Sequence, residues 1–155
     1  AWLHCYFCYK SYRTQLAPTS GSMGYCLPAA VAAKLNHPDR EVICLSGDGC
    51  FQMTMQEFGT AVQYGAKIIV IVFNNGVYGT IRMHQQRDYP GRPSGTTMLN
   101  PDFATLATCY GCSGEVVTKT QDFEAVFARA QASETSTIIE LRTDPAAVSP
   151  RTLIV

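Results

Sequence analysis

Two short polar motifs have residue types and a spacing that suit the binding of a charged ligand. The first is Gly47-Asp48-Gly49 and the second is Asn74-Asn75, and each follows a short apolar run. Positions 50 to 73, which are 24 residues, lie between them. That length holds one helix and one strand, so we interpret the segment as a single βαβ unit. Asp48 and Asn75 should therefore emerge side by side at the carboxyl ends of neighbouring parallel strands, where open α/β sheets bind ligands.

The oxygen atoms of these motifs are suited to a hard cation. Asp48 offers a carboxylate, Asn75 an amide oxygen, and the irregular Gly76-Val77 turn a backbone carbonyl. Magnesium takes six oxygen ligands and commonly leaves several positions to water and phosphate. Because the protein would contribute one formal negative charge, we expect the remaining positions to accept an anionic phosphate ligand.

The residues around Asp48 also favour a diphosphate. Gly47 and Gly49 allow close approach of the backbone, and a helix starting near Phe51 would direct its free amide groups to the same place. The alternative is that the two motifs are unrelated turns, because Ser-Gly-Asp-Gly and Asn-Asn-Gly are ordinary loop sequences. Their spacing, with an apolar strand before each, favours a site.

The rest of the chain alternates between strand and helix patterns. β-Branched or apolar runs indicate strands, and apolar positions at helical spacing indicate helices ending at turn residues. This order predicts one α/β domain, an open parallel sheet with helices on both faces. The expected helices are Gly24–Leu35, Phe51–Tyr64, residues 78–89, Pro101–Tyr110 and Asp122–Ser133, and the expected strands are Glu41–Leu45, Lys67–Phe73, Glu115–Val117 and Thr137–Leu141.

Taken together, these motifs resemble those of thiamine-diphosphate-dependent enzymes, in particular the acetohydroxyacid synthase and 2-oxoacid decarboxylase group. Gly-Asp-Gly followed after 24 residues by Asn-Asn is similar to the cofactor motif of that family. The likeness extends to Gly21-Ser22-Met23-Gly24-Tyr25 with Leu27-Pro28-Ala29-Ala30, to Gln56-Glu57-Phe58 and to Tyr78-Gly79-Thr80-Ile81. It covers residues 17–148, and we assign 17–155 to the cofactor domain and 1–16 to an N-terminal remnant or linker.

The resemblance implies a role for individual residues toward thiamine diphosphate and Mg²⁺. Asp48, the Asn75 side chain and the Val77 carbonyl would bind the metal. Met23 would be an apolar wedge that bends the cofactor, although packing in the core is the alternative for a methionine. The expected cofactor-binding residues are Gly21, Ser22, Met23, Gly47, Asp48, Gly49, Cys50, Asn75, Gly79 and Thr80.

Two features depart from the family pattern. Cys26 and Cys50 stand where relatives have smaller or hydroxyl-bearing residues, and these nearby thiols bring a risk of oxidation. The glutamate that activates the cofactor lies, in this family, in a separate pyrimidine-binding domain, usually of a neighbouring subunit. The chain lacks an initiator methionine, so we interpret it as part of a longer protein or gene, expected to be inactive alone.

Composition excludes several other classes of function. Twelve basic and twelve acidic residues cancel, which gives no reason to expect nucleic acid or an anionic membrane as a partner. No apolar run has the length of a membrane span, and seven cysteines without a secretion signal indicate reduced thiols in the cytoplasm. The pairs Cys5/Cys8 and Cys109/Cys112 leave a zinc-thiolate or redox protein as a further alternative.

The function that we expect is an acetolactate-synthase-like reaction on a 2-oxoacid, with decarboxylation and carboligation. It would need a pyrimidine-binding domain or subunit and a homo-oligomeric assembly. Simple 2-oxoacid decarboxylation is the second choice. A non-catalytic cofactor-binding module or truncated gene product is the third. The particular 2-oxoacid and the presence of FAD in the whole protein are not specified by these residues.

Overall fold

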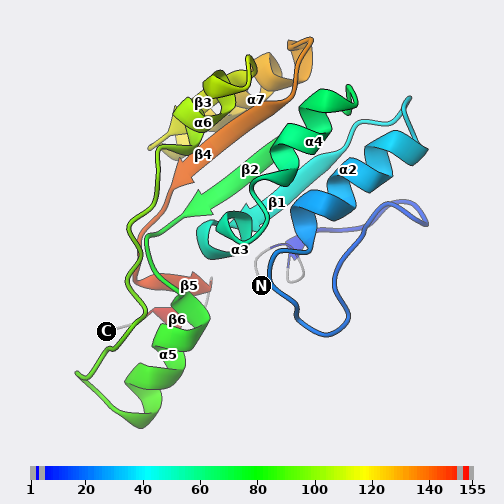
Figure 1. The fold of residues 1–155 in the computed structure, drawn as a ribbon. Coiled ribbons are helices and arrows are strands. Elements are labelled where there is room, and N and C mark those ends of the chain that lie inside the picture. Colours follow the sequence, from blue (N-terminus) through cyan, green and yellow to red (C-terminus); the bar gives the residue numbers. More distant parts are fainter. Residues whose placement is uncertain (1–2, 4–5, 150–151, 154–155) are drawn as a thin grey trace.

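A computed structural model of the chain describes residues 3, 6–149 and 152–153 (Figure 1). Its strands and helices alternate along most of the sequence, as the patterns predict. The helices are α2 (Cys26–Asn36), α3 (Asp48–Gln52), α4 (Glu57–Gln63), α5 (Gly79–Asp88), α6 (Phe103–Cys109), the 3-10 turn η1 (Thr120–Asp122) and α7 (Phe123–Ala132). The strands are β1 (Ile43–Gly47), β2 (Ile69–Asn74), β3 (Ser113–Val117), β4 (Thr137–Arg142), β5 (Ala147–Ser149) and β6 (Thr152–Leu153).

The main sheet has four strands in the order β1-β2-β4-β3, and every neighbouring pair is parallel. Residues of β1 and β2 pair in register, so that Gly47 lies opposite Phe73 at the carboxyl end. The prediction of an open parallel α/β sheet is therefore confirmed. Because all four strands run the same way, the loops that follow β1 and β2 open at one edge of the sheet.

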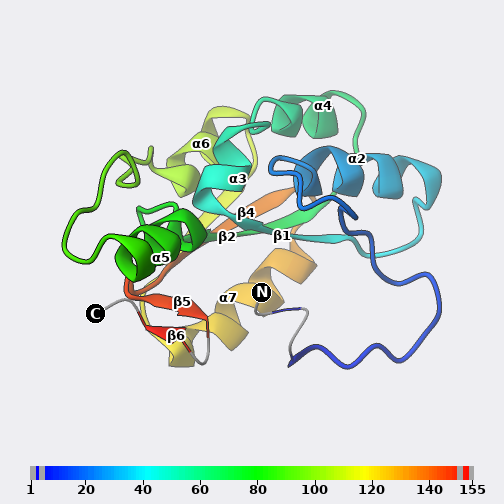
Figure 2. The same cartoon turned by 90° about the horizontal axis from the view of Figure 1, so that it is seen from below.

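Helices cover both faces of the sheet (Figure 2). On one face α2, α3, α4 and α6 enclose a core that includes Leu27, Phe51 and Phe103, all of which are fully buried. On the other face α7 packs Val126 and Ala130 against strand residues such as Ile139. Burial of a parallel sheet on both sides explains the nearly continuous apolar sequence of β2 and β4.

The predicted helix Phe51–Tyr64 was wrong as a single element, since it divides into α3 and α4. Residues 53–56 form turns instead. The Thr54 hydroxyl donates a hydrogen bond at 2.9 Å to the carbonyl of Gly24, which is distant in sequence. This tertiary bond, together with the stiff β-branched side chain of Thr54, accounts for the interruption. Helix α3 also begins earlier than predicted, at Asp48 rather than near Phe51.

The C-terminal hairpin of β5 and β6 was not predicted. Its two strands are antiparallel and pair Ala147 with Leu153 and Ser149 with Thr152. The hairpin lies beside α5, beyond the carboxyl ends of the main strands (Figure 1). Strands of two or three residues are too short to show the apolar runs or the alternation of apolar and polar residues by which a strand is predicted. The sequence pattern that indicated the main sheet was therefore absent from this hairpin.

Gly114 is predicted to be indispensable for packing α6 on β3. A Cβ atom at this position would overlap the backbone carbonyl of Ala104, which belongs to α6. We expect Gly114→Ala to lower the free energy of unfolding by at least about 2 kcal/mol, because backbone atoms cannot yield as a flexible side chain can. Urea denaturation measures the change. Gly47→Ala is the matched control for folding, since Gly47 has φ −71° and nothing within 4 Å of its Cβ position; an equal loss in both variants would contradict the explanation.

Candidate functional site

The structure brings the Gly-Asp-Gly and Asn-Asn motifs together at the carboxyl ends of β1 and β2. Asp48 is the first residue of α3 and is 4% exposed. Its Oδ2 accepts hydrogen bonds from the backbone amides of Asn75, at 3.2 Å, and Gly76, at 2.8 Å. The expected juxtaposition of Asp48 and Asn75 is therefore present, and backbone amides of the second motif hold the carboxylate of the first.

The two oxygens of the Asp48 carboxylate differ in their hydrogen bonds. Oδ2 accepts three, from Asn75, Gly76 and the Nδ2 of Asn100 at 2.7 Å. Oδ1 accepts one, from the amide of Gly49 at 2.9 Å. A carboxylate has about four lone-pair positions. Oδ2 is thus saturated and fixes the orientation of the group, whereas Oδ1 retains room for another ligand.

Two further oxygens belong to the Asn75–Val77 turn, whose Asn75 and Gly76 amides hold this carboxylate. The Asn75 amide oxygen accepts one hydrogen bond, from the Val77 amide at 3.1 Å. The Val77 carbonyl accepts none from the part of the chain that the structure describes. One carboxylate, one amide and one carbonyl oxygen, each with spare lone-pair capacity, form a donor set of the chemistry that Mg²⁺ prefers. The residues present are therefore suited to this metal.

Asn100 belongs to the site and was not among the predicted residues. Its Nδ2 donates to Asp48 Oδ2 and to the Oδ1 of Asn74, both at 2.7 Å. Its own amide oxygen accepts from the Gln52 side chain. Asn100 immediately precedes the predicted helix Pro101–Tyr110. Asn100 reaches the end of β1 only through the path of the loop between α5 and α6. The spacing of residues in the sequence therefore could not predict its place in the site.

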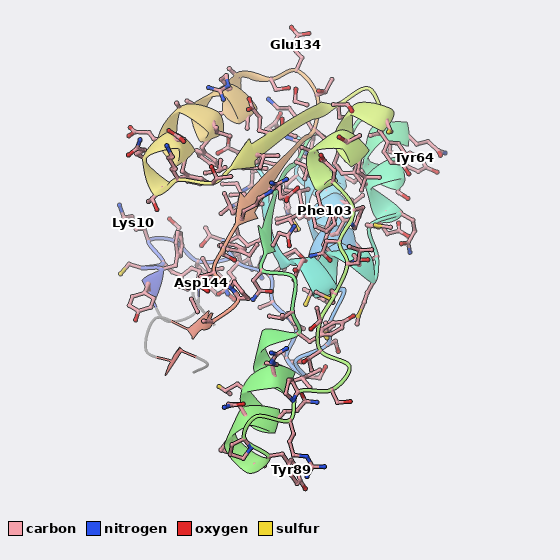
Figure 3. The ribbon with its side chains drawn as sticks, turned by 90° about the vertical axis from the view of Figure 1, so that its left-hand side faces the viewer. Lys10, Tyr64, Tyr89, Phe103, Glu134 and Asp144 are labelled. Carbon is pink, nitrogen blue, oxygen red and sulfur yellow. The ribbon has the colours of Figure 1, made fainter. Side chains whose placement is uncertain are left out.

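A buried carboxylate, Glu140, extends this network into the sheet. Glu140 is 1% exposed and accepts hydrogen bonds from Asn74 Nδ2 at 2.9 Å, from the Phe103 amide at 3.2 Å and from Arg142 Nε at 3.1 Å. Phe103 lies inside the molecule, where α6 meets the sheet (Figure 3). The sequence contained a signal for this network, because Glu140 is a charged residue within the apolar run Thr137–Leu141 and a buried charge requires partners.

Gly49 has a packing role besides the close approach to a ligand that its motif predicts. A Cβ atom there would lie 2.6 Å from Cε1 of Tyr78 and 3.3 Å from Sδ of Met98. The backbone amide of Met98 donates a hydrogen bond at 2.8 Å to the Gly76 carbonyl, and this bond holds the segment around Met98 in place. Gly49 therefore makes room for the ring of Tyr78, which follows the Asn-Asn motif.

The segment Gly21–Tyr25 leads into α2 and approaches the site through Gly24. Gly21 and Gly24 have φ values of +68° and +81°, which favour glycine. Gly24 contacts the α3–α4 turn, because its carbonyl accepts a hydrogen bond from the Thr54 hydroxyl, and Cys50 of α3, which follows Gly49, is half-buried. Met23 is 39% exposed, and the Ser22 hydroxyl lies 2.8 Å from that of Ser20. Met23 is thus not a core residue in this structure, in contrast to the packing alternative.

Gly79 and Thr80 are the first residues of α5, which projects beyond the sheet edge (Figure 1). Tyr78 immediately before them is fixed by a hydrogen bond of 2.8 Å from its amide to the Thr96 carbonyl. The amino terminus of α5 therefore follows directly on the Asn75–Val77 turn. Its first backbone amides lack partners within the helix, as at any helix start.

The described residues do not support the zinc-thiolate alternative. Among them, no group of three or more His, Cys, Asp or Glu could hold a metal ion. Cys8 and Cys109 are exposed free thiols, and Cys112 is a half-buried one. Cys5 lies outside the described residues. Within residues 3, 6–149 and 152–153, no helix is both long enough and apolar enough to cross a membrane.

Comparison with known families agrees with the fold and the motifs. Residues 1–141 match the family described as thiamine pyrophosphate enzyme, C-terminal TPP binding domain. The chain belongs to this family.

Acetolactate synthases are among its relatives. The chain is 41% identical over 124 residues to the acetolactate synthase of Arthrospira platensis. The aligned segment covers 79% of this chain and 21% of that protein. It is 46% identical over 107 residues to the acetolactate synthase large subunit of Corynebacterium glutamicum, covering 66% and 17% respectively. The chain thus spans about a fifth of the length of the curated relatives that it matches.

A solved structure has the same fold. It is the thiamine diphosphate-dependent 4-hydroxybenzoylformate decarboxylase of Rhodococcus jostii, with a TM-score of 0.75 and 39% identity. The match covers 82% of this chain and 24% of that one. This likeness confirms the assignment to the thiamine-diphosphate-binding fold that the sequence motifs suggested.

Proposed function

We propose that this chain binds thiamine diphosphate and Mg²⁺ as one half of a composite active site that acts on a 2-oxoacid. The observation that carries the proposal is the buried Asp48 carboxylate, saturated at Oδ2 and open at Oδ1, beside the Asn75 and Val77 oxygens. Membership of the thiamine pyrophosphate enzyme family supports the choice of cofactor.

Each predicted site residue has a place in this proposal. Asp48 Oδ1, the Asn75 amide oxygen and the Val77 carbonyl bind Mg²⁺, which neutralises the charge of the diphosphate. The backbone at Gly47, Gly49 and Cys50 and at the start of α5, Gly79 and Thr80, supplies amides for the diphosphate. Gly21, Ser22 and Met23 receive the aminopyrimidine end of the cofactor.

When bound, thiamine diphosphate supplies an electron sink for breaking and making bonds next to a carbonyl group. The part that this chain plays is to bind, orient and partly enclose the cofactor. Asn100 and the amides of Asn75 and Gly76 hold Asp48 in one orientation before the metal arrives. Preorganisation of this kind lowers the cost of ordering the site on binding.

The activating carboxylate belongs, in this proposal, to a separate pyrimidine-binding domain or subunit. Two glutamates of this chain have other partners: Glu140 is buried in the Asn74 network, and Glu115 forms an ion pair of 2.8 Å with Arg129. The chain's span of a fifth of its relatives agrees with such a division. A homo-oligomeric assembly and a cytoplasmic location complete the proposal.

Acetolactate-synthase-like carboligation is the first choice of reaction, because the curated relatives named above carry that name. Simple decarboxylation is the second candidate, and the decarboxylase of Rhodococcus jostii with its TM-score of 0.75 favours it. A non-catalytic cofactor-binding module is the third.

Domain complementation distinguishes these candidates. The chain is joined to the amino-terminal and middle parts of the Corynebacterium glutamicum acetolactate synthase large subunit and supplied with pyruvate, thiamine diphosphate and Mg²⁺. We expect acetolactate and CO₂ from the hybrid and none from the chain alone. Acetaldehyde with CO₂ would support decarboxylation. A hybrid that binds the cofactor and yet forms neither product, while the Corynebacterium domain in the same position does, would support the non-catalytic module.

A further inference from the structure

The pair Asn75 and Gly76 has a chemical property that the proposed function does not use. Of the four asparagines of the chain, Asn75 is the one that precedes a glycine. A backbone nitrogen can attack the side-chain carbonyl of the asparagine before it, and a glycine has no side chain to obstruct that approach. Asparagine is accordingly a thermolabile residue. The turn itself favours the glycine, because Gly76 has φ +67°. A labile sequence therefore lies within the proposed metal site.

The other asparagines are less prone to this reaction. Asn100 precedes Pro101, whose ring nitrogen carries no hydrogen. Asn36 and Asn74 precede residues with side chains, which obstruct the approach of the nitrogen. The chain therefore contains its own comparison set for Asn75.

Both groups that would react are held by hydrogen bonds in the folded chain. The Gly76 amide donates at 2.8 Å to Oδ2 of Asp48, which is 4% exposed. The side-chain oxygen of Asn75 accepts at 3.1 Å from the Val77 amide. The attacking nitrogen has to give up its proton as the new bond forms, and here Asp48 holds that proton. The reaction must therefore first break a hydrogen bond to a charged group.

The backbone around these atoms is held at further points. The Asn75 amide also donates to Asp48 Oδ2, at 3.2 Å, and the Gly76 carbonyl accepts from the Met98 amide at 2.8 Å. Closing a ring between the Asn75 side chain and the Gly76 nitrogen requires the backbone at Asn75 to rotate, and these contacts oppose the rotation. Asn75 is half-buried, so burial alone does not exclude water from it.

We propose that Asn75 is a deamidation site and that the Asp48 carboxylate protects it while the chain is folded. In the reaction the Gly76 nitrogen attacks the side-chain Cγ of Asn75. A C–N bond to the backbone forms, and the bond from Cγ to the side-chain nitrogen breaks. That nitrogen leaves as ammonia with the proton of the Gly76 amide, so that a cyclic imide remains. Water then opens the imide at either of its carbonyls and leaves aspartate or isoaspartate, without any oxidation.

The position of Asn75 gives the modification a consequence. Aspartate would place a second negative charge beside Asp48, where the proposed function requires a neutral amide oxygen. Isoaspartate would add a carbon to the main chain before Gly76 and so displace the amide that donates to Asp48. Either product should weaken the stabilisation of the chain by Mg²⁺ and inorganic pyrophosphate. This consequence rests on the proposed function, whereas deamidation and its suppression by folding do not.

Ageing of the full chain tests the site and its protection. The chain is kept at mildly alkaline pH, folded in buffer or unfolded in urea, and samples taken over time are digested with trypsin. Cleavage after Lys67 and Arg82 gives the peptide 68–82, which contains Asn74 and Asn75 and no aspartate. Its mass rises when an amide becomes an acid, and fragment ions assign the change to position 74 or 75.

The unfolded and folded chains should give different results. In urea we expect Asn75 to deamidate faster than Asn36, Asn74 and Asn100. In buffer we expect its rate to be at least about tenfold lower, which is the effect of one hydrogen bond to a charged group. Another asparagine that reacts first in urea would overturn the site, and equal rates for Asn75 in buffer and in urea would overturn its protection.

Variants assign the protection to Asp48. Asp48→Ala and Asp48→Ser remove the carboxylate, and circular dichroism shows whether each is folded. In the folded variants we expect the rate at Asn75 in buffer to rise toward the rate in urea. Gly114→Ala is the control for general loss of stability, because Gly114 lies on β3, at the other edge of the sheet from β1; its rate should stay near that of the wild type. An equal rise in Gly114→Ala, or an unchanged or slower rate in the Asp48 variants, would overturn the role of Asp48.

Thermal unfolding of the aged chain separates this inference from the proposed function. The deamidated chain is isolated by ion exchange and compared with the fresh chain, with and without Mg²⁺ and inorganic pyrophosphate. We expect the ligands to stabilise the fresh chain and to have a smaller effect on the deamidated one. Equal stabilisation of both would overturn the stated consequence. No stabilisation of the fresh chain would contradict the proposed function, while the rates at Asn75 would still decide whether it is a protected deamidation site.

Discussion

Replacing Asp48 with asparagine is expected to abolish the stabilisation of the chain by Mg²⁺ and inorganic pyrophosphate while leaving it folded. An asparagine oxygen can still accept the hydrogen bonds that Oδ2 receives from Asn75, Gly76 and Asn100. Its amide nitrogen would replace Oδ1, and a nitrogen that carries hydrogens cannot bind a metal. Three of the four hydrogen bonds to the side chain are kept and only the one from the Gly49 amide is lost, so the chain should stay folded while the open metal position is removed.

Thermal unfolding with and without the two ligands measures this effect. A ligand at a hundredfold excess over its Kd stabilises a protein by about 2.7 kcal/mol. We expect a stabilisation of this order in the wild-type chain and none in Asp48→Asn. Asp39→Asn is the matched control, because Asp39 is an exposed aspartate in the turn after α2. Equal stabilisation of the wild type and Asp48→Asn would remove Asp48 from the site.

The second large effect is expected at Glu140. Truncation by Glu140→Ala leaves the Asn74 amide and the Phe103 backbone amide without their acceptor, and both are at least partly buried. Since an unsatisfied buried donor costs roughly 1–3 kcal/mol, we expect a loss of about 3 kcal/mol in the free energy of unfolding. Urea denaturation measures it. Loosening of Asn74 should also free Asn100, which hydrogen-bonds both Asn74 and Asp48.

Arg142→Gln is the matched control for that variant. Arg142 donates to the same carboxylate at 3.1 Å, but its side chain is 56% exposed while that of Glu140 is 2% exposed. Partly exposed ion pairs contribute about 1 kcal/mol or less. We therefore expect a small effect from Arg142→Gln. Losses of similar size in the two variants would mean that the ion pair, and not the buried amide donors, accounts for the role of Glu140.

The parallel sheet could be predicted because its evidence is local. The run Ile68–Val72 is apolar and β-branched, and turn residues bound it, so its length and composition indicate a buried strand. The placement of Asp48 beside Asn75 followed from chain direction alone, since both motifs end parallel strands. Predicting that the two motifs of the proposed metal site lie side by side thus needed only a count of the residues between them.

Features decided by distant contacts could not be predicted in the same way. The break between α3 and α4 depends on a hydrogen bond from Thr54 to Gly24, and helical spacing continues through it unchanged. Asn100 reaches Asp48 only because the loop after α5 returns across the sheet edge. The packing role of Gly49 could not be predicted from its motif, because Tyr78, which occupies the space beside it, is distant in sequence. Glu140 could be predicted in part. Its charge within an apolar strand indicated that it has a buried partner, but did not identify that partner.

Isothermal titration of the chain with thiamine diphosphate tests the central claim most directly. Titrations are made in excess Mg²⁺ and, in parallel, in EDTA. We expect saturable binding with one cofactor for each chain in Mg²⁺ and its loss in EDTA, because Asp48, Asn75 and Val77 act on the diphosphate through the metal. Binding of equal strength in EDTA, or no binding to the folded chain under either condition, would contradict it.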